Sequence, residues 1–78
     1  MRSSHAVSAL GALAQEHRLA IFRLLVQAGE DGLAAGAIAD ALGIPASSLS
    51  FHLAQLRHAD LILQERRQRS LVYRANYA

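Results

Sequence analysis

Residues 44–61 read IPASSLSFHLAQLRHADL, and this stretch decides the fold that we expect. Leu49, Leu53 and Leu56 follow the i, i+4, i+7 spacing that lines one face of an α-helix. The opposite side carries mostly polar groups, at Ser47, Ser48, Phe51, Gln55 and His58. Hydroxyls, amides and imidazoles can hydrogen-bond base edges and phosphates, whereas a face meant only for water would carry more charge. The alternative is an ordinary amphipathic surface helix, so the neighbouring segments decide between the two.

A short helix is expected directly before this stretch, over residues 34–42, with Gly43 at its end. Two helices joined by a glycine-containing turn of about three to four residues are typical of a helix-turn-helix. Pro45 lies either just before the second helix or in its first turn. If Ser47 or Ser48 caps that helix, the capping hydroxyl is bonded to the backbone and is less available to DNA.

After this helix the hydrophobic period changes from 3.6 to 2, which predicts a two-stranded hairpin over residues 62–75. Its turn, at residues 68–70, contains no glycine and no Asn-Gly pair. Arg66, Arg67 and Arg69 near the tip can straddle phosphates or enter a minor groove. The alternative is an edge hairpin that charge protects from aggregation. Protection alone would not need three arginines in four residues, so we favour a nucleic-acid contact.

The net charge of +2 is modest but unevenly distributed. Residues 57–78 hold five of the eight basic side chains and only two of the six acidic ones. Every basic residue is arginine, whose fork suits phosphate and guanine, although genomic base composition also explains such a bias. The basic end of the chain is therefore the end with the polar helix and the hairpin, as a surface that binds a polyanion requires.

Two further helices are expected in the first half of the chain, over residues 4–14 and 16–28. The first places Val7, Leu10 and Leu13 three residues apart. The second has a broad apolar face and should be the most buried helix. Leu19, Phe22 and Val26 form one stripe of this face, which is extended round the helix by Ile21, Leu24, Leu25 and Ala28. The predicted fold is thus mainly α, with four helices followed by a two-stranded wing: a winged helix-turn-helix that forms one domain over residues 1–78.

Length and composition exclude several classes of protein. Seventy-eight residues leave a small core, so dimerisation is plausible on size alone. The chain contains no cysteine, so it can form neither a disulfide nor a thiolate metal site. This composition is compatible with a location in the reducing cytoplasm, which we expect. We see no secretory signal and no stretch of the roughly 20 apolar residues that spans a membrane.

Sequence motifs typical of catalytic, cofactor-binding and metal-binding sites are also missing. We therefore expect no enzyme, no cofactor and no metal site. There is no glycine-rich phosphate loop, no nucleophile elbow and no pair of carboxylates in an apolar setting. His52 and His58 are six residues apart, which turns them away from each other, whereas a metal-binding pair needs a spacing of four. His52 lies at the edge of the apolar stripe and is expected to be a structural histidine with its hydrogen bonds satisfied. His58 is expected to reach a phosphate.

Three segments in order resemble the ArsR/SmtB family of small bacterial winged helix-turn-helix repressors. They read ALAQEHRLAIFRLL (12–25), IADALGIPASSLSFHLAQLRHADLI (38–62) and ERRQRSLVYR (65–74). The resemblance implies a homodimer whose recognition helices, about residues 46–59, enter successive major grooves of double-stranded operator DNA until an inducer releases them. The residues that would face the DNA from this helix are Ser47, Ser48, Ser50, Phe51 and Gln55.

Phe51 departs from this pattern, because many relatives have a polar or basic residue there. It either meets a thymine methyl or packs beneath the wing. In the family the first and last helices build the dimer interface, so the resemblance assigns Val7, Leu10 and Leu13 to it. The last helix would begin at about residue 78; without it, a monomer is the alternative.

The inducer site also departs from the family. Metal-sensing relatives carry a Cys-x-Cys pair where this chain has Ala34 and Gly36, and others use residues beyond the wing. We therefore expect a truncated DNA-binding unit, a member that senses something else, or one that senses nothing. The competing function is a winged helix used for protein interaction, but such domains lose the basic wing and the polar helix face that this chain keeps.

Overall fold

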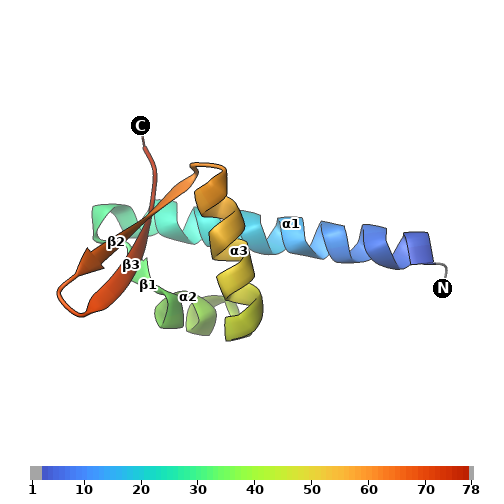
Figure 1. The fold of residues 1–78 in the computed structure, drawn as a ribbon, viewed down its shortest axis with the longest axis horizontal. Helices are drawn as coiled ribbons and strands as arrows, with labels where there is room; N and C mark the ends of the chain where they lie inside the picture. Colours follow the sequence, from blue (N-terminus) through green and yellow to red (C-terminus); the bar gives the residue numbers. More distant parts are fainter. Residues whose placement is uncertain (1–2, 78) are drawn as a thin grey trace.

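A computed structural model describes residues 3–77, with side chains from His5 onward. Figure 1 shows the order of the elements. They are α1 (Ser3–Ala28), a 3-10 turn η1 (Gly29–Asp31), β1 (Leu33–Ala34), α2 (Ala35–Leu42), α3 (Ala46–His58), β2 (Ile62–Arg67) and β3 (Ser70–Ala75). The described chain is therefore mainly helical with a small antiparallel sheet, as the sequence predicts.

The helix α1 corrects the prediction of four helices, because the first two are one continuous helix of 26 residues. Ala14, Gln15 and Glu16, where the break was expected, are all strong helix formers, and no proline lies between the two segments. Residues 3–77 thus contain three α-helices. None of them is long and apolar enough to cross a membrane.

The core lies where α2, α3 and the hairpin pack against the second half of α1. Leu49, Leu53 and Leu56 are buried there, as predicted. Within the predicted broad apolar face of α1, the fully buried residues are Ile21 and Leu25, which extend the predicted stripe. Leu19 and Val26 of the stripe itself lie at the edge of the core and are over 40% exposed. Both pairs are apolar in sequence, so only tertiary packing decides which one is covered.

The turn between α2 and α3 is the short connection that the sequence predicts. Gly43 adopts a left-handed conformation (φ 65°) and its N–H donates to the carbonyl of Ala39 at 2.8 Å, which ends α2. Pro45 is the N-cap of α3, and no side chain caps this helix. The hydroxyls of Ser47 and Ser48 are therefore not used as caps, which leaves them available to a ligand.

The sheet has three strands in the order β1-β3-β2 rather than the two predicted. β2 and β3 form the hairpin, and β1 pairs with the other edge of β3 through Leu33 with Tyr73 and Ala34 with Val72. Gly32 allows this approach, because it has a φ of 63° and a Cβ there would overlap the carbonyl of Tyr73. Strand β1 thus ties the hairpin to the helical part of the molecule.

Candidate nucleic-acid interface

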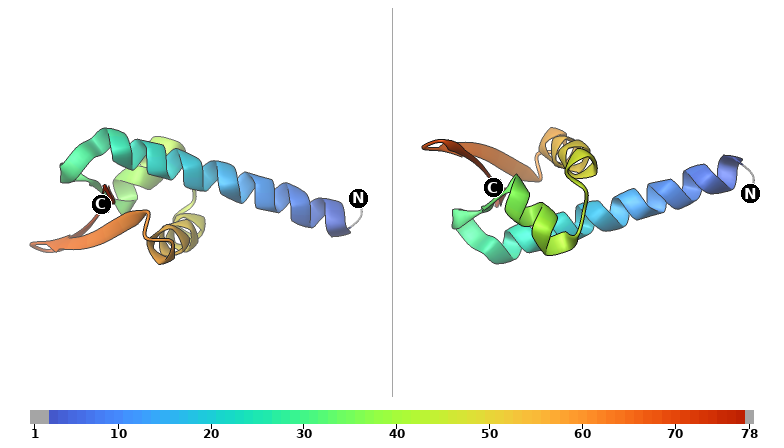
Figure 2. Two further views of the ribbon diagram at one scale, coloured as in Figure 1. Left: turned by 90° about the horizontal axis from the view of Figure 1, so that it is seen from above. Right: turned by 90° about the horizontal axis from the view of Figure 1, so that it is seen from below.

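α3 and the β2–β3 hairpin lie on the same side of the molecule, and α1 lies on the other (Figure 2). Every polar-face residue predicted on α3 is exposed. The sequence therefore correctly separates the buried from the exposed side of this helix. Together α3 and the hairpin present one surface that is not covered by any other described element.

The exposed half of α3 is wider than a single face. Ser47, Phe51 and His58 lie on its outermost line, at spacings of four and seven residues. The flank towards the hairpin carries Ser50 and Arg57, which are seven residues apart. The flank towards α1 carries Ser48 and Gln55, also seven residues apart. The predicted contacts thus cover three adjoining lines, of which one turns towards α1 and away from the hairpin.

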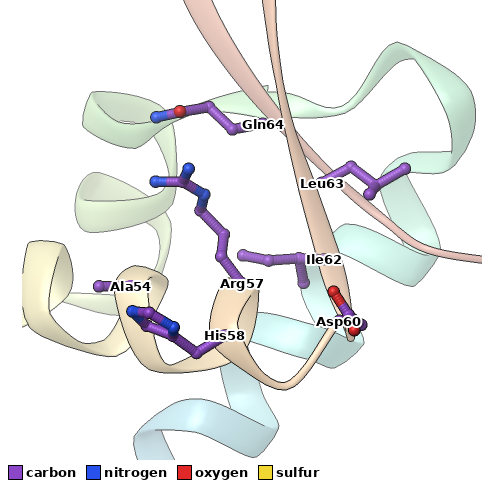
Figure 3. Close-up of a pocket in the computed structure, with 7 residues that line it drawn as sticks. All are labelled: Ala54, Arg57, His58, Asp60, Ile62, Leu63 and Gln64. Atoms are coloured by element: carbon purple, nitrogen blue, oxygen red, sulfur yellow. The ribbon is translucent and has the colours of Figure 1, made fainter.

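A groove of about 310 Å³ separates α3 from β2 (Figure 3). Its lining residues come from the end of α3, the turn after it and the first half of β2: Ala54, Arg57, His58, Asp60, Ile62, Leu63 and Gln64. Arg57 extends from α3 along the strand towards Gln64, whereas Leu63 points to the other side of the strand. Sequence reasoning did not assign a contact to Arg57. The signal was present, because Arg57 lies two turns after Ser50 and begins the basic end of the chain.

The hairpin arginines do not act as one group, because neighbouring residues of a strand point to opposite faces. Arg66 shares the face of Gln64, whereas Arg67 shares the face of Glu65, and Arg69 lies in the turn. The guanidinium groups of Arg66 and Arg69 make no hydrogen bond or ion pair with a residue in the described range. Both side chains are exposed and free to meet an anion.

Arg67 is used inside the protein, which differs from the phosphate contact that we predicted for it. Its Nε donates to Glu65 Oε1 at 2.7 Å, and its two terminal nitrogens donate to the carbonyls of Asp31 (2.9 Å) and Glu30 (2.7 Å). Arg74 also donates to Glu65, at 3.2 Å. These hydrogen bonds lower the pKa of Glu65 and keep it charged. Arg67 thus fastens the hairpin to η1.

Phe51 points outward, with 57% of its surface exposed, which excludes the alternative that it packs beneath the hairpin. The guanidinium carbon of Arg18, on α1, lies 5.8 Å from the centre of the Phe51 ring. This is the geometry of a cation–π contact. The contact links the outer face of α3 to α1 and leaves most of the ring free.

His52 is buried between α3 and α1, and only 6% of it is exposed. Its ring meets the ring of His17 edge to face, with 5.4 Å between the centres. Against our expectation that its hydrogen bonds are satisfied, Nδ1 is buried and has no partner in the described structure. Burial lowers the pKa of His52, and the charges of His17 and Arg18 lower it further. No three side chains able to bind a metal lie together within residues 3–77.

This histidine predicts that acid destabilises the fold. His52 has a pKa near 6.5 in an unfolded chain and a lower one in the folded state, so below pH 6.5 the unfolded chain binds the extra proton. The free energy of unfolding should therefore fall as the pH drops from 6.5 to the lowered pKa, and this contribution should vanish above 6.5. Urea unfolding between pH 5.5 and 7.5 measures it. The pH dependence of the free energy of unfolding should weaken in His52→Gln and persist in the exposed control His5→Gln. An unchanged pH dependence in His52→Gln would contradict the role of His52.

The predicted dimer residues lie on the part of α1 that projects beyond the other elements (Figure 1). Val7 and Leu10 are 69% and 67% exposed, and Leu13 is 47% exposed. Leu10 precedes Ile21 by 11 residues, about three turns, and Val7 precedes Leu25 by 18, or five turns. The buried stripe of α1 thus continues along this projecting arm, where no element of the described structure covers it.

Two helices joined by a three-residue turn, with an arginine-bearing hairpin on the same side, define a helix-turn-helix with a wing-like hairpin. A family model described as a helix-turn-helix domain matches residues 13–65. The match covers more than half of the sequence, so the chain belongs to this family. A comparison with curated proteins gave no match. Membership of the family indicates a DNA-binding regulator.

Proposed function

We propose that the chain is a bacterial transcriptional repressor of the ArsR/SmtB type that binds operator DNA through α3 and the hairpin. The observation that carries this proposal is the shared surface of α3 and the hairpin, on which Arg57, Arg66 and Arg69 are exposed. Duplex DNA presents base edges in a groove between two rows of phosphates. A polar helix flanked by free arginines matches that arrangement of groups.

Within this surface, some side chains read the base edges and others bind the phosphates. The serine hydroxyls of α3 and the side chains of Gln55 and Phe51 read the base edges, with the Phe51 ring suited to a thymine methyl. His58, Arg57, Arg66 and Arg69 hold the phosphates. Arg67 supports them indirectly, because it fixes the hairpin to η1.

Gln55→Ala should therefore relax sequence preference, because an amide that contacts a base edge discriminates between bases by about 1–3 kcal/mol. Selection of binding sites from a random duplex pool measures this preference. The sites recovered by Gln55→Ala should be more varied at one position of each half-site. In contrast, Arg66→Ala should recover the same sites at lower affinity. Equal loss of preference in both variants would contradict this division of tasks.

We further propose that the repressor is a homodimer that uses the arm of α1. The exposed stripe of Val7, Leu10 and Leu13 supports this, since contiguous apolar surface of this kind marks an interaction site. A dimer places two α3 helices about 34 Å apart, one helical turn of DNA. Release from the operator would require an inducer.

Leu10→Asp should shift the protein to the monomer, because it places a charge in the centre of the proposed interface. The fold itself should persist, since Leu10 packs on no other described element. Sedimentation equilibrium measures the dissociation constant, which we expect to rise at least a hundredfold. Ala12→Asp is the matched control, because Ala12 is exposed on the opposite side of the same helix. A dimer of undiminished strength in Leu10→Asp would contradict this interface.

A further inference from the structure

A second groove, of about 410 Å³, lies between α1 and α3 on the flank of α3 that carries Gln55. Its lining is largely apolar. The residues that line it are Gln15, Arg18, Leu19, Phe22, Gln55, Leu56, Ala59 and Leu61. Arg18 is the only charged residue in this set. The groove is therefore an apolar space with a single positive charge at its edge.

Arg18, one of the lining residues, has an unused hydrogen-bond donor. Its Nε is buried and has no hydrogen-bond partner in the described structure, while its guanidinium carbon lies near the Phe51 ring. A buried donor without an acceptor is unfavourable, and the cation–π contact leaves the N–H unpaired. No carboxylate lines the groove to accept it. The missing partner is thus an acceptor, and a negatively charged one complements the arginine best.

We propose that this groove binds a small amphipathic anion, with an apolar body between α1 and α3 and one carboxylate that accepts a hydrogen bond from Arg18. The volume lies within the range of small-molecule sites and suits a body of about two fused rings. Leu19, Phe22 and Leu56 contact that body. The amides of Gln15 and Gln55 lie at the rim and orient the carboxylate.

Such a ligand would act on the recognition helix directly, and this part of the inference rests on the proposed function. Arg18 would turn from the Phe51 ring to the carboxylate, and Gln55 would be held at the groove. Both changes reach residues of the outer surface of α3. A ligand that binds the free protein better than its DNA complex lowers the affinity for DNA by the same factor.

The probe is 2-naphthoate, compared with its uncharged analogue 2-naphthalenemethanol, by NMR of the full chain without DNA. The carboxylate should bind saturably and at least tenfold more tightly than the alcohol, and it should shift the signals of Arg18 Nε–H and the Gln15 and Gln55 amides. Arg18→Gln should abolish the difference between the probes. Arg23→Gln is the matched control, because Arg23 is exposed on α1 and does not line the groove.

Equal binding of the two probes would overturn the proposal, and this comparison on the unaltered protein stands even if Arg18→Gln fails to fold. Shifts confined to the arm around Val7 and Leu10 would also overturn it. If the signals of Gln55 and Ala59 shift with protein concentration alone, a second copy occupies the groove and the proposal is wrong. These measurements contain no DNA, so a failure of DNA binding leaves their result intact.

Discussion

Replacing Arg66 and Arg69 together by alanine should lower the affinity for all duplexes alike, by about tenfold to a hundredfold. Both side chains are exposed, and their guanidinium groups make no hydrogen bond or ion pair with residues of the described chain, so their removal costs the fold little. Phosphate contacts carry no sequence information, which is why unrelated duplexes should be affected equally. Fluorescence anisotropy with several duplexes measures the affinities. The slope of the logarithm of the binding constant against the logarithm of the salt concentration should be less steep by about two than in the parent protein.

Arg67→Ala is the informative comparison, because it also removes one hairpin arginine. It should lower the thermal midpoint, since it removes the hydrogen bonds to Glu65, Glu30 and Asp31. The Arg66 and Arg69 double variant should keep the midpoint of the parent. Undiminished DNA affinity in the double variant, or a loss limited to one sequence, would contradict the phosphate role of these two residues.

Ile21→Ala should destabilise the fold by about 2–5 kcal/mol, a large part of the total stability of so small a protein. Ile21 is fully buried in the core that joins α1 to α2, α3 and the hairpin, so truncation leaves a cavity there. Urea unfolding followed by circular dichroism measures the change. The control is Gln27→Ala, at an exposed position of α1 outside the proposed dimer stripe, which should change the stability by less than about 0.5 kcal/mol. Similar effects of the two substitutions would mean that the core is elsewhere.

Local patterns predicted the elements that depend on near neighbours in the chain. The leucine spacing of residues 49–56 identified the buried side of α3, and Gly43 identified the end of α2. The alternation after residue 61 identified the hairpin. In each case the signal comes from residues that are within a few turns or one strand of each other.

Features that depend on distant residues were not predicted. Strand β1 has only two residues and exists because it pairs with β3, so its sequence has no period to detect. The continuity of α1 was missed because two apolar stripes suggested two helices, although no residue breaks the helix between them. The choice of Ile21 and Leu25 over Leu19 as the core face of α1 also depends on what packs against it.

In the candidate site too, features set by neighbouring residues were predicted and features set by distant residues were not. The exposed polar residues of α3 were predicted because helical spacing determines them. The role of Arg67 was not predicted, because its carbonyl partners lie 36 and 37 residues away in the sequence. The outward position of Phe51 stayed undecided for the same reason, since its neighbour Arg18 is on α1. The place of Arg57 in the groove beside β2 needed only the same helical spacing that placed Ser50.

The affinity of the folded protein for duplex DNA, measured over a series of salt concentrations, tests the proposed function most directly. If Arg57, Arg66 and Arg69 each bind a phosphate as proposed, each displaces counterions, and the logarithm of the binding constant should fall linearly with the logarithm of the salt concentration. The expected slope is about −3 per protomer. A winged helix used for protein interaction would show no such binding. Absence of measurable DNA binding by the folded protein at low salt, or an affinity that salt does not change, would contradict the proposed function.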